Sequence, residues 1–134
     1  MSKLACECGA TISDTTNSLP YKGSIIRDQD QEALFDQMAT DLNAFINAVL
    51  TGKREEWIRH YFLPGYPVEN IGNEEVFADL FRYIVSPSLD VYQCLECGSI
   101  KIQTEPESNT FTSFSSREWT KGRESILQHT HADR

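Results

Sequence analysis

The sequence predicts a single α+β domain of residues 1–134, in which a helical segment separates two short β-strand regions that carry cysteines. All four cysteines lie in two close pairs near opposite ends of the chain, Cys6 with Cys8 and Cys94 with Cys97. Between the pairs, apolar residues recur at spacings of three and four, which is the period of an amphipathic helix. Beside the second pair, apolar residues alternate with polar ones, as they do in strands. A chain of 134 residues can bury a core of this kind without disulfides.

Four to six short strands are expected, and the second cysteine pair lies in the turn of a hairpin. Leu89, Val91 and Gln93 alternate with other residues before the pair. After it, Ile100 and Ile102 alternate with lysine and glutamine, which places the polar side chains on the opposite face. In chain order, the expected strands cover residues 3–6, 11–12, 21–27, 89–94, 99–104 and 110–114.

The clearest helical pattern begins at Asp28 and ends at Gly52. Asp28 or Asp30 is the expected N-cap, where a carboxylate also suits the helix dipole, and Gly52 supplies the stop. The apolar stripe that is expected to face the core consists of Leu34, Phe35, Met38, Leu42, Phe45, Ile46 and Val49.

Two further helices are expected before the second cysteine pair. A short helix at about 53–62 ends at Pro64, and a third helix has Asn73 as its N-cap and ends before Pro87. The buried stripe of the third helix is expected to contain Val76, Phe77, Leu80, Phe81 and Ile84. The polar segment after Ser115 holds at most a short closing helix, which is indicated by Trp119, Ile126 and Leu127.

The two cysteine pairs predict one structural zinc site with Cys6, Cys8, Cys94 and Cys97 as ligands. Four thiolates can surround a tetrahedral ion, and they leave no open position for a catalytic water. A glycine follows each pair, as suits a turn that needs positive φ. The predicted architecture is therefore a zinc ribbon with halves at about 1–27 and 88–115, interrupted by a helical insertion at about 28–87.

Three other cysteine chemistries compete with this interpretation. Two disulfides would suit a secreted protein, but Met1 to Cys6 has no apolar core of a secretory segment. A redox dithiol would need only Cys94 and Cys97 and would leave the first pair unexplained. An iron–sulfur cluster also takes four cysteines, although a pair with one intervening residue suits a mononuclear site at least as well.

The charge of the chain disfavours nucleic acid as a partner. The formal net charge is −8, and four thiolates with one dication would add about two more negative charges. Proteins that bind nucleic acid usually present a basic surface that replaces phosphate counterions. A membrane span is not expected either, because Arg82 interrupts the best apolar run, which extends from Leu80 to Val85.

No catalytic constellation is recognisable in the sequence, so the chain is not expected to be an enzyme. No nucleophile elbow, phosphate-binding glycine loop or metalloprotease motif is present. His60 lies among aromatic residues of a helix, and the other two histidines lie in the last six residues. Adjacent acids such as Glu74 and Glu75 point in different directions on a helix and cannot form a carboxylate dyad.

Acidic residues of the predicted insertion are the candidate partner-binding residues. Between Asp28 and Leu50 there are acids but no lysine or arginine, which describes either an ordinary solvated exterior or a surface that captures a basic partner. The candidate contacts are Glu32, Asp36, Asp41, Glu74, Glu75 and Asp79, with Trp57, Tyr61 and Tyr66 as exposed aromatic anchors.

Both cysteine regions resemble a group of small bacterial zinc-ribbon proteins. The similarity runs from Cys6 to Asp30 and from Tyr92 over the second pair into the following strand. Some members of this group lie beside polymorphic toxin genes of the Rhs and type VI secretion kind, which implies that they are immunity proteins. The resemblance covers residues 6–30 and 92–103, whereas residues 31–90, where such pairs tend to carry their specificity, resemble no family.

The resemblance implies a cytoplasmic, non-catalytic protein that binds and neutralises a cognate toxin domain. A zinc-ribbon adaptor that docks on transcription or nucleic-acid machinery is the alternative, although the negative charge disfavours it unless it docks on protein. An enzyme that uses Asp and Glu chemistry in a cleft is a third possibility.

Overall fold

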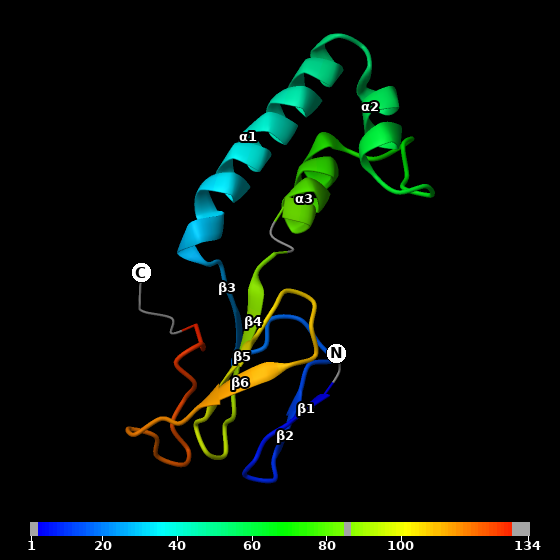
Figure 1. The fold of residues 1–134 in the computed structure, drawn as a ribbon. Coiled ribbons are helices and arrows are strands. Elements are labelled where there is room, and N and C mark those ends of the chain that lie inside the picture. The colour runs from blue at the N-terminus through cyan, green and yellow to red at the C-terminus, as the bar shows by residue number, and fades with distance from the viewer. Residues whose placement is uncertain (1–2, 85–86, 130–134) are drawn as a thin grey trace, which may run out of the picture. The chain divides into compact units, whose positions relative to one another are not determined.

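The computed structural model describes residues 3–84 and 87–129, which form an α+β structure with three helices and antiparallel sheets (Figure 1). The chain divides into two compact units. The sheet unit comprises Met1–Ile26 and Pro87–Arg134, and the helical unit comprises Arg27–Ser86. This division falls near the predicted borders of the helical insertion, and the expectation of a single domain stays a prediction.

The sheet unit contains a two-stranded and a four-stranded antiparallel sheet. The two-stranded sheet pairs β1 (Lys3–Ala5) with β2 (Thr11–Ser13). The four-stranded sheet has the order β3 (Lys22–Ile25), β4 (Leu89–Gln93), β5 (Ile100–Gln103) and β6 (Phe111–Phe114). The upper number of expected strands is therefore confirmed, and their ends lie within two residues of the expected ones.

One cross-strand row of the four-stranded sheet has a special composition. Lys22 pairs with Tyr92, Tyr92 with Lys101, and Lys101 with Ser113, so these four residues lie side by side across all four strands. Tyr92 is buried in the same apolar cluster as Ile12 of β2. The β1–β2 hairpin is therefore packed against the sheet, and side chains of this row can reach it.

The helical unit contains α1 (Asp28–Leu50), α2 (Arg54–Tyr61) and α3 (Asn73–Ile84). Its buried centre combines Phe45, Ile58, Phe62 and Val76, one or more residues from each helix and the segment after α2. These bounds confirm the three predicted helices. Gly52, which follows the end of α1, has a φ of 74°, as a helix-terminating glycine requires.

The predicted N-cap of α1 is wrong. The N-cap of α1 is Arg27, and it makes no side-chain capping bond. Asp28 and Asp30 lie inside the first turn, where their charge still suits the helix dipole, and Asp30 accepts a hydrogen bond from Arg27 Nε at 2.7 Å. Asn73 is the first residue of α3, and its side-chain oxygen accepts a hydrogen bond from Arg54 Nε at 2.8 Å.

The predicted apolar stripes are buried only in part. On α1, Phe45 is buried, whereas Phe35 and Ile46 are exposed at 63% and 46%. The reason is the face of the helix: Phe35 and Ile46 are eleven residues apart and therefore point in nearly the same direction, roughly 80–100° around α1 from Phe45, whereas the buried face contains Asp41, Phe45 and Ala48. On α3, Phe81 is exposed at 41%, and the side chain of Ile84 lies outside the described part of the structure.

The predicted closing helix is absent from the segment that the structure describes after β6, which ends at residue 129 and consists of turns and bends. Within residues 3–84 and 87–129, no helix combines the length and the apolar composition that crossing a bilayer requires.

Candidate metal centre

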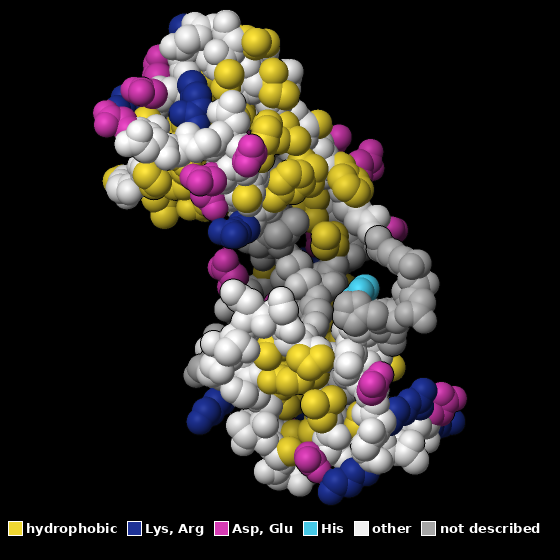
Figure 2. All heavy atoms as spheres, turned by 180° about the vertical axis from the view of Figure 1, so that it is seen from behind, with side chains coloured by type: hydrophobic (Ala, Val, Ile, Leu, Met, Phe, Trp, Pro, Cys, Tyr) yellow, Lys and Arg dark blue, Asp and Glu magenta, His cyan; other side chains and the backbone are white. Residues whose placement is uncertain are grey.

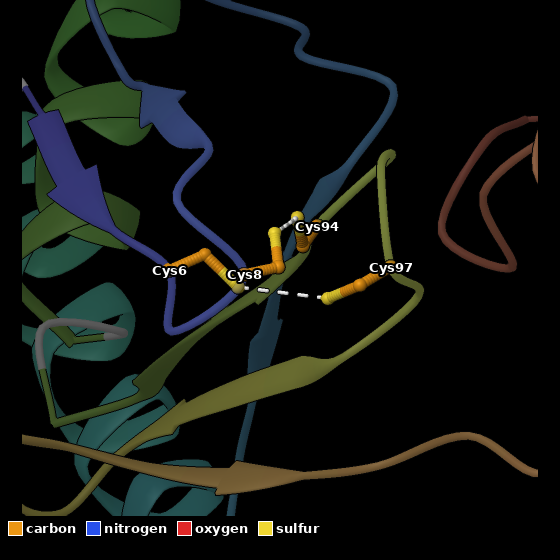
Figure 3. A group of neighbouring side chains, drawn as sticks. All are labelled: Cys6, Cys8, Cys94 and Cys97. Carbon is orange, nitrogen blue, oxygen red and sulfur yellow. Dashed lines mark hydrogen bonds between the residues drawn. The ribbon is translucent and has the colours of Figure 1, made fainter.

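The four cysteines meet in the sheet unit, where two turns face each other (Figure 3). Cys6 follows β1 and Cys8 lies in the turn to β2, whereas Cys94 follows β4 and Cys97 lies in the turn to β5. All four Sγ atoms lie within 4.8 Å of one another. The expectation that both pairs contribute to one cluster is therefore confirmed.

The spacing of the sulfur atoms fits shared coordination of one ion. The Sγ atoms of Cys6 and Cys97 are 3.6 Å apart, and those of Cys8 and Cys94 are 3.7 Å apart. A tetrahedral ion with metal–sulfur bonds of about 2.3 Å would place its ligands about 3.8 Å apart. A disulfide needs a sulfur–sulfur distance of about 2.05 Å, and all four thiols are free. The donor set and its geometry thus suit a metal ion.

The two turns have equivalent backbone hydrogen bonds although one is a residue shorter. In the first, the N–H of Gly9 donates to the carbonyl of Cys6 at 3.0 Å; in the second, the N–H of Gly98 donates to the carbonyl of Cys94 at 2.8 Å. Both glycines have positive φ, 94° and 75°, as the sequence predicted. The Cys94 N–H also donates to the carbonyl of Ser99 at 2.9 Å, which closes the second turn.

The surroundings shift the pKa values of the thiols in different directions. Burial raises the pKa of Cys6 to about 12, although a backbone hydrogen bond from Cys8 acts in the opposite direction. Burial also opposes ionisation of Cys94, but hydrogen bonds from the backbone of Cys97 and Glu96 outweigh it and lower the pKa of this thiol. Because thiolates are the metal-binding form, a bound cation would favour deprotonation of all four groups.

A buried lysine lies beside this cluster. Lys101 of β5 is only 1% exposed, and its ammonium group donates hydrogen bonds to the Glu7 carboxylate and to Ser113 Oγ, the latter at 2.7 Å. Ser113 in turn donates to the second Glu7 oxygen at 2.8 Å. Burial opposes the charge of Lys101, but the hydrogen bond to Glu7, followed by the influence of Cys6, outweighs it and raises the pKa of this lysine. The Cys6 thiol donates to the same Glu7 oxygen at 3.7 Å. The sequence pattern had placed this lysine on a polar face, which the β1–β2 hairpin in fact covers.

A second acidic residue attaches the same hairpin to the sheet. Asp14, just after β2, accepts a hydrogen bond from Lys22 Nζ at 2.6 Å and another from the Tyr92 hydroxyl group. These bonds outweigh the effect of burial and lower the pKa of Asp14. The cross-strand row therefore holds the first cysteine turn through two carboxylates, Glu7 and Asp14.

The segment after β6 covers the second cysteine turn. Trp119 Nε1 donates to the carbonyl of Glu96 at 3.3 Å. The buried Gln93 side chain donates to the carbonyl of Gly98 at 3.2 Å and accepts from the N–H of Ile126 at 3.0 Å. No local pattern in the sequence indicates this role, because the contacts join residues that are far apart in the chain.

The predicted partner-binding acids fall into two groups. Glu32, Asp36, Glu74 and Glu75 are exposed. Asp41 is buried at 8% exposure, so it cannot be part of an exposed acidic surface, as its choice as a candidate partner contact required. It accepts hydrogen bonds from Tyr61 at 2.7 Å and from Gln37 at 2.8 Å. Asp79 is half-buried and accepts bonds from Tyr66 at 2.7 Å and Arg82 at 3.1 Å.

The aromatic side chains expected as exposed anchors are half-buried. The rings of Trp57 and Tyr61 stack at 4.7 Å between centroids, and Tyr66 stacks on Phe62 at 3.9 Å. Trp57 also lines a groove of about 390 Å³ between α1 and α2, together with the exposed His60. The packing of the helical unit therefore uses most of these rings, and Phe35 is a far more exposed aromatic residue.

The fold and the cysteine cluster define an α+β protein with a four-thiol candidate metal centre. The chain belongs to the family described as a domain of unknown function (DUF8617), whose profile matches residues 2–118. This match contains both cysteine pairs and the whole helical unit. No curated protein and no solved structure matches the chain.

Proposed function

We propose that the protein is a cytoplasmic, non-catalytic immunity protein, stabilised by one structural zinc ion, that neutralises a cognate bacterial toxin by binding it. The sheet unit is then a zinc ribbon whose two cysteine turns are joined by the metal. The helical unit, which separates the ribbon halves in the sequence, carries the partner surface.

The choice of zinc rests on the donor set. Four thiolates at tetrahedral spacing are the usual ligands of structural zinc, and they leave no coordination position for water or substrate. The separations of 3.6 and 3.7 Å between paired sulfur atoms support the same geometry. Iron in a mononuclear or cluster form is the competing metal for such a site.

Metal analysis of protein purified under reducing conditions tests this part. One equivalent of zinc per chain is expected, and replacement by cobalt should give the absorption of a tetrahedral thiolate site. Less than half an equivalent of any metal, or iron in place of zinc, would contradict the zinc assignment.

The partner surface rests on one observation about α1. Phe35 is 63% exposed, and the exposed Glu32 and Asp36 lie on either side of it in the sequence. No lysine or arginine lies between Asp28 and Leu50. Figure 2 shows hydrophobic side chains gathered on the helical unit with acidic side chains among them. An exposed aromatic residue between acids suits a partner with an apolar pocket and a basic rim.

Charge reversal tests this surface. With the toxin domain encoded beside this gene, the protein is expected to form a stoichiometric complex and to protect cells. The double variant Glu32→Lys/Asp36→Lys should lower the association rate at least tenfold and weaken protection, because such charges steer association. Glu118→Lys/Glu124→Lys is the matched control, with the same change of net charge at exposed acids of the sheet unit.

The outcomes separate the hypotheses. An equal loss in both double variants would indicate an effect of net charge alone, and no loss in either would overturn the acidic surface. Absence of any complex with the neighbouring gene product would overturn the immunity function itself. Recovery of a polymerase or ribosomal complex instead would favour the adaptor.

A further inference from the structure

The environment of Lys101 is unusual for a lysine. Its side chain is 2% exposed, whereas the carboxylate that it binds, Glu7, belongs to a side chain that is 71% exposed. Burying an ammonium group is costly unless strong hydrogen bonds and a counter-charge compensate. A solvated carboxylate compensates only in part, because water screens its charge.

The four thiols supply the remaining compensation. With a dication bound, four thiolates carry a net charge of −2, and the Glu7 oxygen that accepts from the Lys101 ammonium group lies 3.7 Å from the Cys6 Sγ atom. Between buried groups the screening is weak, so the negative charge of the thiolates adds to the attraction of the exposed Glu7. The sequence position of Glu7, between the ligands Cys6 and Cys8, brings the ammonium to the first cysteine turn.

We propose that Lys101 is the charge-balancing and positioning residue of the metal centre. Through Glu7 and Ser113 it holds the first cysteine turn against β5 and β6, and its charge lies next to the Cys6 sulfur because both groups contact the same Glu7 oxygen. This inference rests on the zinc site proposed above and concerns a residue that is not itself a ligand. Groups that hydrogen-bond to metal ligands commonly change metal affinity by about 10–100-fold.

The competing explanation is that Lys101 and Glu7 form an ordinary buried ion pair that has no effect on metal binding. The chain offers a matched control in Lys22, which lies in the same cross-strand row and binds a carboxylate of the same hairpin, Asp14, at 2.6 Å. No cysteine is among the groups that shift the pKa of Lys22. Lys22→Met therefore removes an equivalent ion pair and one positive charge, whereas Lys101→Met also removes the cation beside a ligand.

The experiment compares the full-length protein with Lys101→Met, Lys22→Met and Glu7→Gln, by chelator competition for zinc and by the absorption of the cobalt forms. Lys101→Met should weaken zinc binding at least tenfold and move the sulfur-to-cobalt charge-transfer band to longer wavelength, because an unbalanced thiolate gives up an electron more easily. Lys22→Met should leave the band in place and zinc affinity within about threefold. Glu7→Gln should weaken zinc binding without moving the band.

If Lys101→Met does not fold, Lys101→Gln and Lys101→Arg replace it. The arginine keeps the charge and should keep the band position, whereas the glutamine should move it. Equal behaviour of the Lys101 and Lys22 variants, with an unmoved band, would overturn this inference while leaving the zinc site intact. Failure of the wild-type protein to bind zinc and cobalt would overturn both proposals.

Discussion

Gly98 and Trp119 are packed so closely that no side chain fits between them: a Cβ atom built on Gly98 would overlap with the indole ring. Gly98 is buried in the second cysteine turn with a φ of 75°, so both its conformation and its contact favour glycine. The segment after β6 is thereby tied to the turn that carries Cys94 and Cys97.

Gly98→Ala is expected to lower the free energy of unfolding by about 2–4 kcal/mol, from about 1 kcal/mol of backbone strain plus about 1–3 kcal/mol of overpacking. Chemical denaturation of the metal-bound protein measures it. The matched control is Gly9→Ala in the first turn, where φ is 94° but no atom lies within 4 Å of the added Cβ. The control should lose only the backbone part, and adding Trp119→Ala to Gly98→Ala should remove part of the difference. Equal losses at both glycines would contradict the packing argument.

The contrast between Gly98 and Gly9 shows which features a local sequence pattern can predict and which it cannot. The recurrence of apolar residues at spacings of three and four predicted α1 with both ends close to the observed ones. The pairing of the cysteines predicted that these four thiols meet. Both features depend on neighbouring residues or on a chemistry that needs four ligands. The cover that Trp119 provides depends on where a remote segment returns, which no local pattern encodes.

The errors concern which face of an element is covered. Lys101 was predicted on a polar face because it alternates with isoleucines, but the β1–β2 hairpin lies over that face. Asp41 was predicted to be a partner contact, but Tyr61 of α2 reaches it. Phe35 was predicted to be buried, but the packing of the helical unit covers the neighbouring face of α1, which contains Asp41, Phe45 and Ala48. In each case tertiary contacts, not propensity, decided the outcome.

The hydrogen bond between Tyr61 and Asp41 should contribute measurably to the stability of the helical unit. A hydrogen bond to a charged group contributes about 1.5–3 kcal/mol, and Tyr61→Phe should cost about that much. A double-mutant cycle with Asp41→Ala should give a coupling energy of about 1–2 kcal/mol. Asp36→Ala, an exposed acid on the same helix, is the control and should change stability by less than about 0.5 kcal/mol. A coupling near zero would show that the buried carboxylate does not depend on this tyrosine.

Alkaline conditions should destabilise the protein through its buried phenols. Burial, followed by hydrogen bonding to Asp14, raises the pKa of Tyr92 to about 12, and burial with bonds to Asp41 and Asp79 raises the pKa values of Tyr61 and Tyr66. The unfolded value is about 10. Because the folded values are higher, this contribution to stability is complete below about pH 10 and is lost as the pH rises through the folded values.

Phenolate absorbance measured against pH tests this expectation. At least three of the five tyrosines should ionise late and together with unfolding. Tyr92→Phe should make stability fall less steeply above pH 10, after allowance for its lower starting value. Ionisation of all tyrosines near pH 10 in protein that is still folded would contradict the prediction.

Nucleic acid should not bind, because the formal net charge is −8 and bound thiolates would make it more negative. At physiological salt, the dissociation constant for DNA or RNA is expected to be no tighter than about 10⁻⁴ M. Titration of labelled duplex DNA and single-stranded RNA measures it. A sub-micromolar constant with steep salt dependence would revive the adaptor hypothesis.

Removing the metal should affect the two units differently. The candidate ligands Cys6 and Cys8 belong to the β1–β2 hairpin, whereas Cys94 and Cys97 belong to the turn between β4 and β5. A metal that joins them contributes to folding of the sheet unit, so Cys94→Ser or chelation should cost several kcal/mol there. The helical unit supplies no ligand, and its centre around Phe45 and Ile58 is formed within residues 27–86.

Hydrogen exchange of the chelated protein distinguishes these effects. The amide of Cys94, which is bonded to the carbonyl of Ser99, should lose protection, whereas amides near Phe45 in α1 should keep most of theirs. Adding zinc back should restore the protection of amides in the second cysteine turn, and Cys94→Ser should prevent this recovery. Uniform loss of protection in both units would show that they unfold together. Unchanged protection in both would show that the thiols hold the sheet unit together without a metal.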